Sequence, residues 1–133
     1  MLLIKQIILV ALGGGLGSVC RFLISVALPK FTLTSPWVVT SFPLATFVIN
    51  ISGCFLVGLI SAYFNEHSNL SPNLKLLLIM GFCGGFTTFS TFAFEKVNLI
   101  QNGNYTTFFL YVFSSIIIGI LAVFLGFWVG TGK

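Results

Sequence analysis

Four long apolar stretches occupy most of this chain of 133 residues and leave only short connections between them. They cover residues 3–28, 38–64, 74–100 and 105–129. The hydrocarbon core of a bilayer is about 30 Å thick, and a helix needs roughly 20 apolar residues to cross it. Each stretch meets that length. The pattern predicts a single domain over residues 1–133, an all-α membrane protein with four transmembrane helices.

The scarcity of charged residues excludes a water-soluble globule. They make up 6% of the chain, whereas soluble domains average about 25% because a surface in water has to be solvated. The first stretch is longer than a signal-peptide core of about 7–15 residues, so we expect it to be retained. The six basic residues are spread along the chain and form no nucleic-acid surface. We expect a multi-pass protein of the cell (plasma or inner) membrane, surrounded by the lipid bilayer.

The lysines give almost no preference for one orientation in the membrane. With four spans, one side carries Lys5, Lys75 and Lys133, and the opposite side carries Lys30 and Lys96. An excess of lysine and arginine normally marks the cytoplasmic side. Three against two leaves two hypotheses open: one orientation set by another signal, or insertion both ways round with antiparallel pairing. A monomer of four helices has little interior in which to hold a polar path. A homodimer would supply such a path at or near its interface.

Small and polar residues recur at helical spacing in the first, second and fourth stretches. Residues three or four apart share a helix face. The sets are Gly13, Gly17, Arg21 and Ser25 in the first stretch, Thr46, Asn50 and Gly53 in the second, and Thr107, Tyr111 and Ser115 in the fourth. The glycines favour close helix packing. Arg21 either binds backbone carbonyls near a membrane face or draws anions inward. Asn50 either bonds a neighbouring helix or offers its amide to a passing anion, and the hydroxyls either bond the backbone or line a path.

The third stretch departs most from a simple membrane helix. From Gly81 it reads GFCGGFTTFSTFAFEK. Gly84 and Gly85 each weaken a helix by about 1 kcal/mol relative to alanine. A broken backbone inside a membrane is tolerated only where protein or a cavity satisfies it, and its free carbonyls and amides can bind ions. We therefore predict a broken third helix, with a continuous helix carrying a glycine packing face as the alternative.

The polar groups inside the stretches suit a small anion better than a cation in transit. They are an amide, hydroxyls and the positive edges of phenylalanine rings. The first two stretches hold no acid, and Glu95 follows the predicted break, whereas a proton-driven carrier is expected to bury an acid as its relay. The freed carbonyls suit one fixed hard cation, since such ions take oxygen ligands. These groups indicate ion handling without covalent chemistry, so we do not expect an enzyme.

These features resemble the Fluc/CrcB family of fluoride channels over nearly the whole chain. The first stretch is rich in glycine and ends in Cys20-Arg21-Phe22. The second contains Ala45-Thr46-Phe47-Val48-Ile49-Asn50 followed by Ile51-Ser52-Gly53. The third contains GFCGGFTTFSTF from Gly81 to Phe92, which is the most specific segment. Ala45 and Phe47 stand where the family usually has glycine and leucine.

The resemblance implies a fluoride-selective channel for passive export of cytoplasmic fluoride, built as an antiparallel dual-topology homodimer with two pores. It implies a fluoride pore lined by Phe89, Phe92, Asn50, Tyr111, Ser115, Thr46, Ser90 and Thr91. A central structural sodium ion, shared between subunits, would be held by the backbone carbonyls of Gly84 and Thr87. Arg21 would lie at a vestibule and Glu95 near an exit. A proton-coupled small four-span transporter and a non-transporting assembly subunit are the competing hypotheses.

Overall fold

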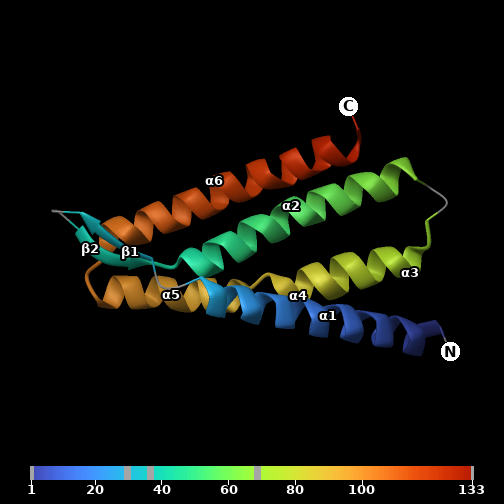
Figure 1. Ribbon diagram of the computed structural model, residues 1–133, viewed down its shortest axis with the longest axis horizontal. Coiled ribbons are helices and arrows are strands. Elements are labelled where there is room, and N and C mark those ends of the chain that lie inside the picture. Colours follow the sequence, from blue (N-terminus) through green and yellow to red (C-terminus); the bar gives the residue numbers. More distant parts are fainter. Residues whose placement is uncertain (1, 29–30, 36–37, 68–69, 133) are drawn as a thin grey trace.

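The computed structural model describes residues 2–28, 31–35, 38–67 and 70–132. Within them, four helical segments are long and apolar enough to cross a membrane: α1 (Leu2–Ala27), α2 (Leu44–Glu66), the segment Pro72–Gln101, and α6 (Tyr105–Gly130). Figure 1 shows the start of α1 and the end of α6 at one end of the molecule, and the turn before α6 at the other. The predicted four helices are confirmed. Lys30 and Lys133, which entered the lysine comparison, lie outside the described residues.

The third segment is assembled from several helical pieces. These are α3 (Pro72–Lys75), the π-helix η1 (Leu76–Cys83), α4 (Gly84–Phe86) and α5 (Phe89–Gln101). Thr87 (φ −77°, ψ 159°) and Thr88 (φ −146°, ψ 120°) have extended conformations between α4 and α5. The Thr88 side chain caps α5 by accepting a hydrogen bond from the amide of Thr91, which starts the new helix. π-Helical turns are rare and often mark functional sites.

The second membrane helix begins later than the sequence suggested. We expected it to start at Val38, but Val38–Phe42 forms strand β2, which pairs antiparallel with β1 (Phe31–Ser35). The helix α2 starts at Leu44, directly after Pro43. Proline disfavours helical geometry in the residue before it, and β-branched residues favour strands. The fold of the described residues is therefore all-helical apart from this hairpin.

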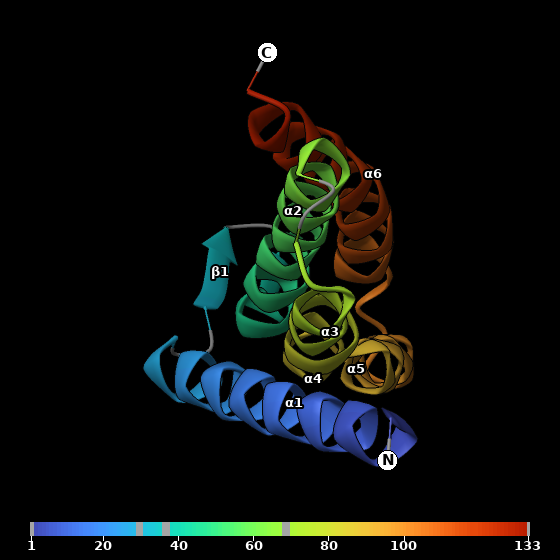
Figure 2. The same ribbon diagram turned by 90° about the vertical axis from the view of Figure 1, so that its right-hand side faces the viewer.

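Glycines let α1 lie directly against the backbone of the third segment. Gly13 and Gly17 are buried in α1. A Cβ atom at Gly13 would collide with the carbonyl oxygen of Leu77, and one at Gly17 with the carbonyl oxygen of Phe82. Figure 2 shows α1 running across the third segment near α3 and α4. The predicted role of these two glycines in helix packing is confirmed.

Helices α2 and α6 also pack closely at glycines, and they lie side by side in Figure 1. A Cβ atom at Gly58 would collide with the carbonyl oxygen of Val123, and one at Gly126 with that of Phe55. The outward faces are apolar: Leu16 on α1 is 62% exposed and Phe124 on α6 is 68% exposed. Side chains of this kind on the outside of a helical bundle are suited to lipid.

Candidate functional site

The side chain of Asn50 binds the backbone of the extended residue Thr88. Its Nδ2 donates to the carbonyl oxygen of Thr88 at 3.1 Å, and the Thr88 amide donates to its Oδ1 at 2.9 Å. Thr88 is 8% exposed, so its peptide groups have little access to solvent. Asn50 therefore satisfies the peptide groups that the interruption between α4 and α5 leaves outside a helix. One N–H of its amide group remains to donate elsewhere.

The hydroxyl of Thr88 joins the predicted pore residues Ser90 and Thr91 into one cluster. Its Oγ1 donates to Oγ1 of Thr91 at 3.1 Å and accepts from the Thr91 amide at 3.3 Å. Oγ of Ser90 lies 3.4 Å from the same hydroxyl. Ser90 and Thr91 are exposed in the single chain. The start of α5 thus presents two accessible hydroxyls next to the Asn50 contact.

Glu95 connects the second and fourth membrane helices through two hydroxyl groups. Oγ1 of Thr46 donates to its Oε1 at 2.7 Å, and the phenol of Tyr111 donates to its Oε2 at 2.7 Å. Tyr111 is fully buried and Thr46 is 6% exposed. Hydrogen bonds to a carboxylate are among the stronger ones in proteins. The structure therefore places the acid among the hydroxyl groups predicted to line a path, and both of its oxygens are engaged there.

The two predicted phenylalanines follow one another on α5. The ring centroids of Phe89 and Phe92 are 6.2 Å apart and the planes are tilted by 55°. Phe92 also makes a T-shaped contact with Tyr111, with centroids 4.9 Å apart. Phe89 is 76% exposed, and the ammonium of Lys96 lies over both rings. The aromatic pair thus connects an exposed surface of the chain with the buried phenol.

A groove of about 370 Å³ runs past the interrupted helix. Its polar and aromatic lining comes from α2, α5, α6 and the extended residues, and comprises Asn50, Thr87, Thr88, Phe89, Phe92 and Ser115. Oγ of Ser115 is buried and has no hydrogen-bond partner among the described residues. Buried hydroxyls are nearly always paired. Ser115 therefore has a donor beside the groove that no described residue uses.

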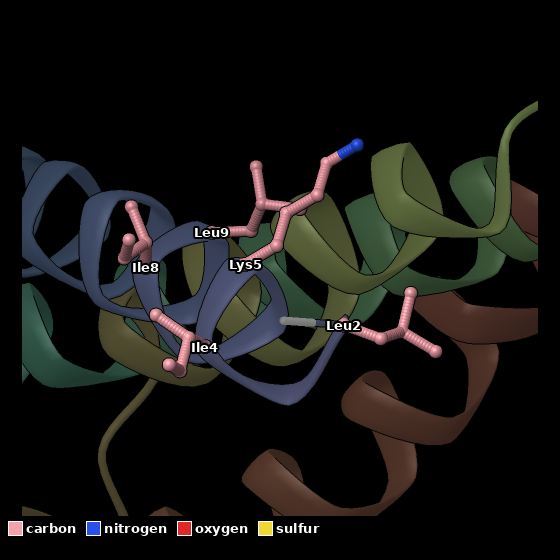
Figure 3. A pocket seen from close by; sticks show the side chains of 5 residues that line it. All are labelled: Leu2, Ile4, Lys5, Ile8 and Leu9. Carbon is pink, nitrogen blue, oxygen red and sulfur yellow. The ribbon is translucent and has the colours of Figure 1, made fainter.

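A second, polar pocket of about 400 Å³ is lined by Thr46, Thr91, Glu95, Asn98, Asn102 and Asn104 among others. Thr46 and Glu95 link it to the hydroxyl contacts described above. A third hollow lies at the start of α1, far along the chain from the interruption (Figure 3). Leu2, Ile4, Ile8 and Leu9 line it together with Lys5, and its walls are almost entirely apolar.

The carbonyl groups of Gly84 and Thr87 fit the expectation of oxygen ligands for a hard cation. In a continuous helix they would accept from the amides of Thr88 and Thr91. Those amides donate instead to Asn50 and to the Thr88 hydroxyl. Gly84 is also exposed on the chain surface. Among the described residues, no cluster of three or more His, Cys, Asp or Glu side chains offers an alternative metal site.

Arg21, another predicted site residue, lies apart from the groove and the polar pocket. It is half-buried on α1, and it is absent from the linings of the groove and of the polar pocket. Two further residues beside the groove, Thr88 and Lys96, were not predicted from the sequence. Thr88 binds Asn50 through its backbone, and the identity of its side chain gives no signal of that contact. Lys96 stands four and seven residues after Phe92 and Phe89, and this helical spacing was the available signal.

Most of the chain is similar to the proteins of one family. Residues 8–127 match the family model described as CrcB-like protein, Camphor Resistance (CrcB). The chain is 45% identical over 125 residues to the fluoride-specific ion channel FluC of Azobacteroides pseudotrichonymphae, covering 94% of this chain and 95% of that relative. It is 46% identical over 121 residues to the protein of the same name from Hydrogenobaculum sp., covering 91% and 93%. The chain therefore belongs to the CrcB family and is a multi-pass membrane protein.

Proposed function

We propose that this chain forms a fluoride-selective ion channel, the function stated in the names of its relatives. The observation that carries the proposal is the buried Ser115 hydroxyl, which finds no partner in the described part of the chain, in a groove shared with Asn50 and two phenylalanine rings. These groups are neutral, and the ring edges carry partial positive charge. Such a lining suits a small anion that accepts hydrogen bonds, and it replaces the hydration shell of a cation poorly.

The pore that we propose passes from this groove towards the polar pocket around Glu95. Fluoride would meet the edges of Phe89 and Phe92 with Asn50 and Ser115 as donors. It would then exchange among the hydroxyls of Tyr111 and Thr46, which bind Glu95, and those of Ser90 and Thr91, which lie beside the Thr88 hydroxyl. Arg21 and Glu95 would act near the two ends. Transport is passive in this proposal, because fluoride that enters a cell as the neutral acid dissociates in the cytoplasm and leaves down its own gradient.

The complete channel in this proposal is an antiparallel dual-topology homodimer with two pores. Two observations support it. Phe89 is 76% exposed although it lines the groove, so one chain leaves the pore open on that side. The lysines give almost no orientation bias, as expected when both orientations insert. A second copy related by a two-fold axis would cover both grooves with one self-complementary contact.

We further propose that one sodium ion binds where the two copies meet, between the carbonyls of Gly84 and Thr87 from both chains. The support is that the usual amide donors to these carbonyls bind elsewhere. A bound cation would supply a fixed positive charge beside two anion paths. The protein's contribution is to hold the carbonyl oxygens in place through the Asn50 contact and the cap of α5.

One observation favours a second candidate, a proton-coupled transporter. Glu95 is a half-buried acid inside a membrane segment, and it is bound by two hydroxyls. Acids in such positions often relay protons. The two candidates differ in their dependence on pH, since a passive channel needs no proton gradient and a coupled carrier does.

Reconstituted protein is expected to release fluoride from liposomes far faster than chloride. Proteoliposomes loaded with potassium fluoride or potassium chloride are opened to flux with valinomycin, and external halide is followed with ion-selective electrodes at equal internal and external pH. Fluoride release should remain fast without a pH gradient. Equal fluoride and chloride rates would reject the selective channel. Fluoride release only under a pH gradient would favour the coupled transporter, and no flux of either ion would favour a non-transporting subunit.

Removing sodium is expected to slow fluoride release. Samples purified and assayed in N-methylglucamine salts should lose flux and regain it when sodium is added back, because the carbonyl oxygens would repel one another without a cation between them. Potassium and lithium at equal concentration serve as matched additions. Full flux after sodium depletion to trace levels would contradict a required sodium ion, and equal rescue by potassium would contradict its identity.

A further inference from the structure

The side chain of Lys96 lies over the faces of the two groove phenylalanines. Its Nζ is 4.0 Å from the ring centroid of Phe92 and 5.7 Å from that of Phe89. The neighbouring acid, Glu95, is directed elsewhere, since its two oxygens accept from Thr46 and Tyr111. Lys96 is half-buried and lies within the third membrane segment. Its charge is therefore placed on the aromatic pair rather than on a carboxylate.

The electrostatics of an aromatic ring give this placement a consequence for anion binding. The ring face is negative and the edge is positive, so a cation is attracted to the face. The same cation draws π-electron density towards itself, which makes the edge of that ring more positive. It also covers the part of the ring that repels an anion. An ammonium on the face of Phe92 thus favours an anion at the edge of the same ring.

We propose that Lys96 is a positioning residue for the anion-binding rings. Its ammonium holds the faces of Phe92 and Phe89, fixes the tilt between them, and strengthens the attraction of their edges for fluoride in the groove. This inference rests on the proposed function as a fluoride channel. It differs from the usual behaviour of a membrane lysine, which extends its ammonium towards the headgroups, because here the ammonium stays on the rings.

The experiment compares fluoride release by the wild-type chain with Lys96→Met and Lys96→Arg in proteoliposomes over a range of internal fluoride concentrations. Lys96→Met keeps a long apolar stem and removes the charge. It should lower the release rate at low fluoride by about tenfold and raise the fluoride concentration that gives half-maximal rate. Lys96→Arg keeps a cation that stacks on aromatic faces, so both quantities should stay near wild type.

A matched control removes the same charge elsewhere. Lys75 is exposed at the end of α3, so Lys75→Met should leave the half-maximal concentration unchanged. A release rate and half-maximal concentration like wild type in Lys96→Met would overturn the inference. It would also be overturned if Lys75→Met or Lys96→Arg changed these two quantities as much as Lys96→Met does. If Lys96→Met aggregates, Lys96→Gln is judged by the same criteria. Absence of fluoride flux in the wild type would reject the proposed function and this inference together, whereas the other outcomes reject the inference alone.

Discussion

Replacing Phe92 with isoleucine is expected to lower the fluoride release rate by about tenfold or more while the protein remains folded. An aromatic edge contact is worth up to about 1.5 kcal/mol, and each 1.4 kcal/mol changes an equilibrium about tenfold. Isoleucine fills much of the same space but has no quadrupole. It would also remove the T-shaped contact with Tyr111 at 4.9 Å and the face under Lys96. Flux is measured with a fluoride electrode, and folding by gel filtration of the detergent-solubilised protein.

Phe94 provides the matched control for this prediction. It lies on the same helix, is 66% exposed, and does not line the groove. Phe94→Ile should therefore conduct like wild type, whereas Phe89→Ile should be impaired like Phe92→Ile. Wild-type flux in both Phe89→Ile and Phe92→Ile would refute the role of the ring edges. Equal loss in Phe94→Ile would show that the effect comes from helix packing.

The parts of the fold that lipid dictates could be predicted from the sequence. Crossing a membrane requires a long apolar run, so four runs gave four helices. Close packing requires small residues at helical spacing, which identified Gly13 and Gly17. The predicted start of α2 was wrong because Val38, Val39 and Phe42 in the strand extend the apolar stretch towards the helix, with only Thr40, Ser41 and Pro43 between them and Leu44. Composition alone does not separate an apolar strand from an apolar helix.

The sequence singled out polar residues in the membrane segments, but not the contacts that they make. Asn50 was expected either to bond a neighbouring helix or to meet a passing anion, but its partner Thr88 lies 38 positions away and binds through its backbone. Glu95 was expected near an exit, and only the folded chain shows both its oxygens accepting from hydroxyls on α2 and α6. Lys96 was counted as a charge of a connection, which hid its position over the Phe92 ring. Contacts between distant segments depend on helix rotation, which residue spacing within one segment does not fix.

Replacing Asn50 with alanine is expected to lower stability and abolish fluoride release together. The change removes both hydrogen bonds to Thr88, at 3.1 and 2.9 Å. Each buried peptide group left unpaired costs about 1–3 kcal/mol. The melting temperature in detergent should therefore fall by several degrees, as measured by fluorescence or by loss of the gel-filtration peak. Ser52→Ala is the matched control, because the Ser52 hydroxyl donates only to carbonyls of its own helix, at Val48 and Ile49.

Asn50→Asp separates the two roles of this side chain. An aspartate keeps an oxygen that can accept from the Thr88 amide, but when ionised it donates nothing and adds a negative charge beside the groove. It should retain more stability than Asn50→Ala and still block fluoride. A melting temperature equal to wild type in Asn50→Ala would mean that water already satisfies the Thr88 peptide groups, which contradicts a structural contact. Fluoride flux near wild type in Asn50→Asp would mean that the amide donor is not needed by the moving anion, even if the contact with Thr88 supports the interrupted helix.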